Sequence, residues 1–224
     1  MSKKQGAFLG FLGCLTVPYL DKNEIDALLA IPDQSTTQGF RDYSLLLFLY
    51  NSGARASEAA QLTIGNFDSS CGSATILGKG RKQRQCPLWP ITVNALSVLV
   101  GKRPFHERVF LNRCGQPMTR YGIHALVERT ARKAQVDTPS LATKRISPHS
   151  IRHSTATHLL RSGVDINIVR AWLGHVSINT TNVYTEIDLE GKAKALAKCE
   201  ISQNKETGKR WLEDPDLMVF LRHL

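Results

Sequence analysis

Hydrophobic residues recur at helical spacing over most of the chain. The first predicted helix begins with a capping box formed by Asp21 and Glu24, continues to Ile31 and ends before Pro32. A second begins near Phe40, buries one apolar face and ends at the next glycine. The same spacing predicts further helices over residues 56–62, 92–100 and 120–135.

Between these helices the pattern changes to short β-type runs. Residues 73–77 and 85–89 flank a basic turn with two glycines, which predicts a β-hairpin. Residues 109–111 are a third candidate strand. The pattern is therefore typical of an α+β protein, mainly α, with one small antiparallel sheet.

Helical spacing returns in the last third of the chain. Pro148 suits the first turn of a helix, which should run to Arg161 and stop at Gly163. Asp165 should cap the next helix, which ends at Gly174. Helices are also expected over residues 179–184, 189–198 and 214–224, with a polar linker over 202–209.

This organisation predicts one domain with two appendages. Residues 1–20 form an N-terminal segment, interpreted as a remnant or a linker; residues 21–200 form the domain; residues 201–224 form a linker and a C-terminal helix. The apolar face of that helix can dock on a neighbouring protomer or on its own domain. Residues 7–17 superficially resemble a signal peptide, but they are too short to span a bilayer and no small-x-small site follows.

Charge and cysteine content narrow the function. The net charge is +10 and the pI is about 9.6, which favours a polyanionic partner such as nucleic acid, although a soluble protein can be basic for other reasons. The five cysteines include no C-x-x-C pair, which favours free thiols in a reducing compartment over disulfides or a structural zinc site. We therefore expect a cytoplasmic, nucleoid-associated protein without a membrane segment.

Two arginines and a histidine have the chemistry to hold a phosphodiester. Arg55 and Arg152 can each grip two phosphate oxygens, while His149 shares a helix face with Arg152 and can move a proton. Each also has an ordinary alternative. Arg55 can pair with Glu58 along a helix, and His149 can be a structural histidine. His149 and His153 lack the intervening Glu of the H-E-x-x-H pattern, so no metal site is predicted.

The proton donor and the nucleophile are expected on other segments. Lys79, between two glycines of the predicted hairpin, can protonate a departing oxygen, and Lys82 is a rival for that role. Tyr184 is the candidate nucleophile and needs cationic neighbours to react near neutral pH, since a free phenol has a pKa of about 10. His175 follows a predicted helix end and can fold over the same site.

Taken in order, these residues resemble the catalytic domain of the tyrosine recombinases, the phage-integrase and Xer-like family. The resemblance spans roughly residues 20–190 and rests on motifs with family-like neighbours: Ala54-Arg55-Ala56-Ser57-Glu58, Gly78-Lys79-Gly80, His149-Ser150-Ile151-Arg152-His153, Leu173-Gly174-His175 and Tyr184. It implies the tyrosine-recombinase catalytic fold, a helical domain with a small antiparallel three-stranded sheet. Family members usually carry an N-terminal helical domain that closes a clamp on DNA. Only about twenty residues precede the first predicted helix of the domain, so the chain is either a fragment or a short member, and in both cases we expect weak, salt-sensitive DNA binding.

The resemblance also implies a mechanism. Tyr184 would attack a DNA phosphate and form a 3′-phosphotyrosyl link, with Lys79 as general acid. The catalytic set would be Arg55, Lys79, His149, Arg152, His175 and Tyr184, with Glu58 in support and with Arg81, Lys82 and Arg84 binding DNA. No cofactor, metal or ATP would be needed.

The implied partner is double-stranded DNA, on which the protein would act as a homo-oligomer, typically a tetramer. Three alternatives remain: a non-catalytic DNA-binding or regulatory module on the same fold, a type IB topoisomerase, and a metal-dependent nuclease. The sequence does not identify the target site.

Overall fold

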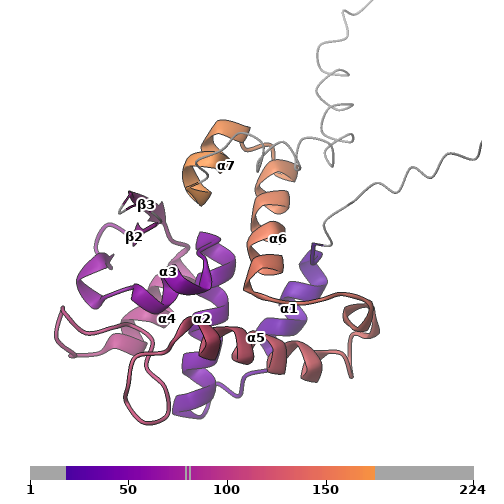
Figure 1. Ribbon diagram of the computed structural model, residues 1–224, viewed down its shortest axis with the longest axis horizontal. Coiled ribbons are helices and arrows are strands. Elements are labelled where there is room, and N and C mark those ends of the chain that lie inside the picture. Colours follow the sequence, from indigo (N-terminus) through magenta and orange to yellow (C-terminus); the bar gives the residue numbers. More distant parts are fainter. Residues whose placement is uncertain (1–18, 79, 81, 175–224) are drawn as a thin grey trace, which may run out of the picture. The chain divides into compact units, whose positions relative to one another are not determined.

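The computed structural model describes residues 19–78, 80 and 82–174 (Figure 1). The chain divides into two compact units, residues 1–188 and 189–224, and every described residue belongs to the first. Within the described residues no helix is long and apolar enough to cross a membrane. The helices predicted over residues 179–184, 189–198 and 214–224 lie outside the described residues.

Helix α2 (Thr37–Ser52) is the central element of the described unit. Its side chains are largely buried, and it packs against α1 (Lys22–Ala30), α4 (Pro90–Val100) and α6 (Pro148–Arg161). The core includes Phe48, whose ring lies 5.8 Å from that of Phe110 between centroids. Helix α3 (Ala56–Gln61) packs against α5 (Arg120–Ala134), and α7 (Ile166–Leu173) packs against α6 (Figure 1).

The helix boundaries follow the caps that the sequence indicates. Asp21 and Glu24 form the predicted capping box at the start of α1. Gly53 and Gly174 adopt left-handed backbone conformations, with φ of 59° and 64°, and terminate α2 and α7. At Gly53 a side chain would also collide with Leu173, since a Cβ atom there would lie 2.4 Å from its Cδ2 atom.

The sheet has three antiparallel strands in the order β1-β2-β3, which confirms the predicted fold class. The strands are β1 (Phe67–Asp68), β2 (Ser73–Leu77) and β3 (Gln83–Pro87). Two expectations were wrong in detail. The second strand of the hairpin starts two residues earlier than predicted, because Leu77 pairs with Gln83.

The strand expected at residues 109–111 is the second error. That segment forms one isolated bridge, Leu111 with Pro117, and the residue before it forms another, Arg108 with Thr63. Val109 donates its N–H to Leu62 O, and Phe110 O accepts from Met118, so the backbone groups are satisfied outside the sheet. The edge position is taken instead by β1. The described cysteines, Cys71, Cys86 and Cys114, are free thiols, as expected.

Candidate active site

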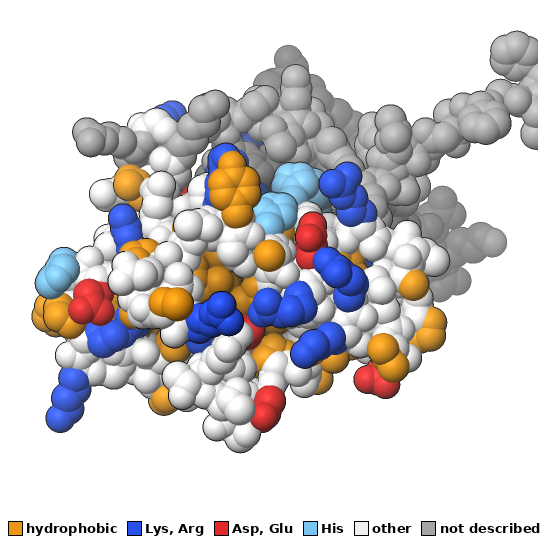
Figure 2. All heavy atoms as spheres, turned by 60° about the horizontal axis from the view of Figure 1, so that its bottom comes forward, with side chains coloured by type: hydrophobic (Ala, Val, Ile, Leu, Met, Phe, Trp, Pro, Cys, Tyr) orange, Lys and Arg blue, Asp and Glu red, His pale blue; other side chains and the backbone are white. Residues whose placement is uncertain are grey.

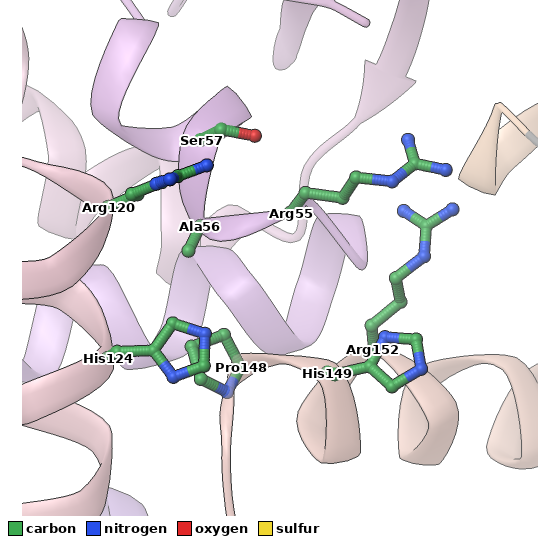
Figure 3. Close-up of a pocket in the computed structure, with 8 residues that line it drawn as sticks. All are labelled: Arg55, Ala56, Ser57, Arg120, His124, Pro148, His149 and Arg152. Atoms are coloured by element: carbon green, nitrogen blue, oxygen red, sulfur yellow. The ribbon is translucent and has the colours of Figure 1, made fainter. Parts of the chain in front are cut away.

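A pocket of about 220 Å³ opens where the start of α3 faces the start of α6 (Figure 3). Three of the residues predicted to bind phosphate line it: Arg55, His149 and Arg152. Arg55 precedes α3, while the other two stand one turn apart on α6. Figure 3 shows both guanidinium groups extending to the same side of the pocket, beside the imidazole of His149. Segments about a hundred residues apart in sequence thus bring two cations and an imidazole together.

Helix α5 forms the opposite wall of the pocket, and the residues of this wall were not predicted from the sequence. Arg120 and His124, on its first turns, line the pocket together with Ser57 of α3 (Figure 3). The guanidinium of Arg120 lies 4.6 Å from the ring centroid of Tyr121 and donates to its hydroxyl at 2.6 Å. Arg120 and His124 stand four residues apart on α5, and this spacing was the only signal in the sequence that they share a helix face.

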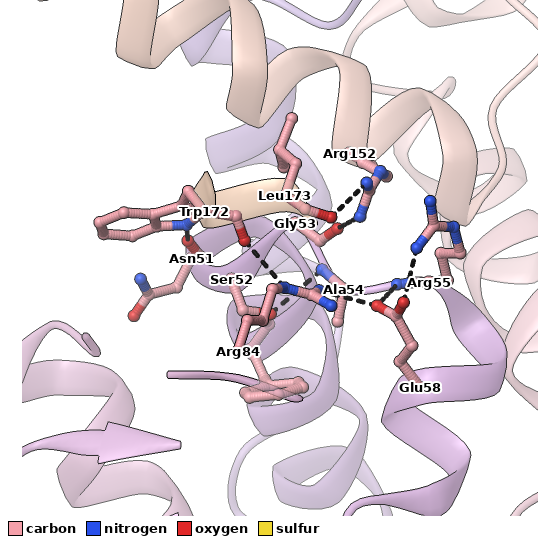
Figure 4. Close-up of polar contacts among 11 residues, drawn as sticks. Asn51, Ser52, Gly53, Ala54, Arg55, Glu58, Arg84, Arg152, Trp172 and Leu173 are labelled. Atoms are coloured by element: carbon pink, nitrogen blue, oxygen red, sulfur yellow. Dashed lines mark hydrogen bonds and ion pairs between the residues drawn. The ribbon is translucent and has the colours of Figure 1, made fainter. Parts of the chain in front are cut away.

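Arg152 is fixed by main-chain carbonyls at two helix ends. Only 3% of its surface is exposed, and its Nη1 and Nη2 atoms donate to Gly53 O at 2.5 Å and Leu173 O at 2.6 Å (Figure 4). Both acceptors lie at the C-terminal end of a helix, where the dipole favours a cation. These bonds hold the guanidinium with little freedom to reorient.

Arg55 forms an ion pair with Glu58, which was one of its two predicted roles, and it also lines the pocket. Glu58 Oε1 accepts from Arg55 Nη1 at 2.6 Å, and Glu58 Oε2 accepts from the Arg55 backbone N–H at 2.9 Å. The Arg55 side chain is 42% exposed while that of Glu58 is 3% exposed. The carboxylate is therefore a buried support for a cation that reaches into the pocket.

Arg84 completes this ion-pair group from strand β3. It donates from Nη2 to Glu58 Oε2 at 2.7 Å and from Nε to Trp172 O at 2.8 Å (Figure 4). Burial alone would raise the pKa of Glu58, but the hydrogen bonds and charge of Arg84, together with hydrogen bonds from Arg55, outweigh it and lower that pKa. Glu58 is thus ionised at neutral pH.

His149 and His153 contact each other through their imidazole rings. Their Nε2 atoms lie 2.8 Å apart and their rings are nearly perpendicular, so one donates the hydrogen that the other accepts. Burial lowers the pKa of His149, and the positive charges of Arg152 and Arg55 add to that effect. Burial also lowers the pKa of His153, to about 4, helped by His149 and Arg152. Both imidazoles are neutral at pH 7, and a neutral imidazole can accept a proton.

The remaining predicted residues are distributed differently. Lys82 is exposed at the hairpin, where its carbonyl accepts the Gly78 N–H at 2.8 Å. Lys79, Arg81, His175 and Tyr184 lie outside the described residues. In the described ranges no group of three or more His, Cys, Asp or Glu side chains is arranged to hold a metal ion.

Basic side chains are spread over the face drawn in Figure 2, with histidines among them. Acidic side chains on that face are fewer and scattered. Such a surface attracts a polyanion without requiring a particular sequence of its units.

Comparisons with known proteins find matches over most of the chain. Residues 18–190 match the model of the phage integrase family. The chain is 35% identical, over 211 residues, to a putative integrase/recombinase y4rC of Sinorhizobium fredii, an alignment that covers 93% of this chain and 63% of that protein. It is also 35% identical, over 175 residues, to the tyrosine recombinase XerD of Staphylococcus saprophyticus, covering 75% of this chain and 57% of the relative.

A solved structure shows the same architecture. The XerH site-specific recombinase bound to its difH substrate in a pre-cleavage complex superposes with a TM-score of 0.67 at 28% identity, covering 83% of this chain and 55% of XerH. The chain therefore spans somewhat more than half the length of the proteins it matches.

Proposed function

The chain belongs to the phage integrase family, and from this membership we propose that it carries the DNA-cleaving and rejoining domain of a site-specific recombinase. The observation that carries the proposal is the pocket in which Arg55, Arg152 and His149 converge. Two guanidinium groups on one side of a small pocket suit the oxygens of a single phosphodiester. A phosphate undergoing attack gains negative charge on those oxygens, and preorganised cations stabilise that charge best.

The reaction we propose is a transesterification at phosphorus. The phenolic oxygen of Tyr184 forms a bond to the DNA phosphorus as the bond to the 5′ oxygen breaks, and the departing oxygen takes a proton from Lys79. The neutral His149 can take the proton that leaves the phenol, with His175 adding a hydrogen bond to the phosphate. The products are a 3′-phosphotyrosyl link and a free 5′ hydroxyl.

Rejoining would reverse these steps. A 5′ hydroxyl, from the same or another duplex, attacks the phosphotyrosyl phosphorus and releases Tyr184. One phosphoester bond is exchanged for another in each direction, so no ATP is consumed. We propose that Arg81 and Lys82 hold the DNA backbone beside the site. The protein would act as a tetramer on double-stranded DNA, in the cytoplasm at the nucleoid, in integration, excision, dimer resolution or transposition.

Covalent trapping tests the proposal. The protein and its Tyr184→Phe variant would be incubated, with EDTA present, with nicked duplexes drawn from DNA that flanks the gene, in which cleavage releases a short strand and prevents rejoining. The expected result is a denaturation-resistant protein–DNA adduct from the unchanged protein and none from the variant. DNA binding without an adduct would contradict the proposal and favour a non-catalytic DNA-binding module, and cleavage that EDTA abolishes would favour a metal-dependent nuclease.

A further inference from the structure

Arg84 is a buried charge on a strand whose neighbours are exposed. Its side chain is only 9% exposed, whereas Gln83 and Gln85 on either side are exposed. A guanidinium is seldom removed from water unless it is paired and hydrogen-bonded. The sequence suggested a DNA contact for Arg84, but its polar atoms point into the protein.

The guanidinium contacts two other elements through directed hydrogen bonds. It donates to Glu58 of α3 and to Trp172 O at the end of α7, at 2.7 and 2.8 Å. Glu58 in turn holds Arg55, with one carboxylate oxygen on each arginine side chain. Strand β3, helix α3 and helix α7 therefore meet at one side chain (Figure 4).

Two glycines lie against the same group. A Cβ atom on Gly174 would approach the Cδ and Nη1 atoms of Arg84 to 3.2 Å, and one on Gly78 would lie 3.7 Å from Nη1. Gly78 immediately precedes Lys79, and Gly174 immediately precedes His175. The guanidinium thus lies close to the last described residue before each of these two candidate catalytic residues, and it reaches a third, Arg55, through Glu58.

From these contacts we propose that Arg84 is a positioning residue, which sets Arg55, Gly78 at the end of β2 and Gly174 at the end of α7 relative to one another. The inference rests on the proposed function and adds a residue that acts without touching DNA. Arginine suits the task because its planar fork donates in several fixed directions. A lysine could make a point contact with Glu58 but could not hold Trp172 O in the same geometry.

The test separates positioning from DNA contact and from a merely structural role. Arg84→Lys and Arg84→Gln would be compared with unchanged protein and with Arg132→Gln, a control that removes an exposed arginine of α5. Four quantities would be measured for each: the melting temperature, the dissociation constant for the nicked duplex, its dependence on salt, and the rate of covalent adduct formation at saturating DNA.

We expect Arg84→Gln to slow adduct formation at saturating DNA by about 10- to 100-fold, because small misplacements of reacting groups cost rates of that order. Its DNA affinity should stay within about twofold of the unchanged protein, with the same salt slope, since a group that makes no phosphate contact releases no counterions. The rate of adduct formation of Arg84→Lys should lie between the rates of the unchanged protein and Arg84→Gln. Arg132→Gln should form adduct at the unchanged rate.

Three results would overturn the inference. The first is an unchanged rate in Arg84→Gln. The second is a loss that appears only in affinity, with the salt slope reduced by about one, which would make Arg84 a DNA contact. The third applies if Arg84→Gln has a lowered melting temperature. The double variant Glu58→Gln/Arg84→Gln removes both charges of the pair and should regain much of the melting temperature. If the rate of adduct formation recovers together with the melting temperature, the role of Arg84 is structural only.

Failure of the proposed function would look different. In that case the unchanged protein and Arg132→Gln would also form no adduct, and the inference about Arg84 would fall with it. If those two proteins form adduct, any change seen in the Arg84 variants reflects the role of Arg84 itself.

Discussion

The buried carboxylate of Glu58 gives the sharpest test of how the site is held together. Glu58→Gln keeps the size and shape of the side chain but removes its negative charge. The amide can still accept a hydrogen bond from one arginine, while its NH₂ group must face the other. Arg84, 9% exposed, would then keep its positive charge inside the protein without a counter-ion in Glu58.

The structure sets the size of the effect. Breaking a buried ion pair by removing one partner typically costs about 3–5 kcal/mol, and an exposed pair contributes about 0.2–1 kcal/mol. The Arg84–Glu58 pair is of the first kind and the Arg55–Glu58 pair, with Arg55 42% exposed, is closer to the second. The bond from Arg84 to Trp172 O survives, so we expect a loss of about 3 kcal/mol at pH 7. For a protein of this length that lowers the melting temperature by about 6–12 °C.

The pH dependence of this loss has a definite sign. The pKa of Glu58 is lowered in the folded protein, so its ionised form stabilises the fold above the ordinary glutamate pKa. That stabilisation disappears as the pH falls through the lowered pKa, because the unchanged protein then carries a neutral carboxyl as well. The difference between Glu58→Gln and unchanged protein should therefore be largest at pH 7 and shrink toward zero below the lowered pKa.

Urea unfolding at pH 7, 5, 4 and 3, followed by circular dichroism, measures the difference directly. The midpoints should separate at pH 7 and converge in acid, with equal slopes in urea. Exposed Glu128 on α5 provides the matched control, Glu128→Gln, for which a change within about 0.5 kcal/mol is expected. A Glu58→Gln variant as stable as unchanged protein at pH 7, or equally weakened at every pH, would show that the Glu58 carboxylate does not stabilise the fold through its charge.

Three further predictions concern the pocket. Arg55→Lys should slow adduct formation on the order of 10³-fold, about 4 kcal/mol, because an ammonium cannot replace the bidentate fork, and near-normal cleavage would remove Arg55 from the site. Arg152→Lys should lower the melting temperature by about 4–12 °C through loss of one of two charged bonds to main-chain carbonyls, and calorimetry showing no shift would contradict that role. The folded pKa of His153 is lowered to about 4, so protonation favours the unfolded state, and stability should fall as the pH drops from about 6.5 to about 4. His153→Gln should reduce that fall, and an identical profile in urea titrations would count against a neutral His153.

Local signals in the sequence predicted most of the helices. Asp21 with Glu24, and the glycines at 53 and 174, act through their own backbone and side-chain geometry, so their effect can be read without knowing the fold. The third strand could not be found this way. Residues 67–68 form a strand only because β2 lies beside them, and residues 109–111 look like a strand but find hydrogen-bond partners elsewhere.

Three residues of the pocket were predictable from the sequence, whereas the connections that hold them were not. Arg55, His149 and Arg152 were expected together from their chemistry and order, and they line one pocket. The carbonyls that hold Arg152 carry no sequence signal, because every residue has one. The inward direction of Arg84 did have a signal: it stands two residues before buried Cys86 on β3, and side chains two apart share a face of a strand.

We propose above that the pocket of Arg55, His149 and Arg152 binds a phosphate attacked by Tyr184. The most direct measurement is to digest the trapped protein–DNA adduct with protease and nuclease and to locate the remaining nucleotide by mass spectrometry. We expect a nucleotide joined through its 3′ phosphate to the hydroxyl of Tyr184. A nucleotide on another residue, such as Tyr121 next to Arg120 of the pocket, or one joined through its 5′ phosphate, would show that Tyr184 is not the nucleophile of the proposed reaction.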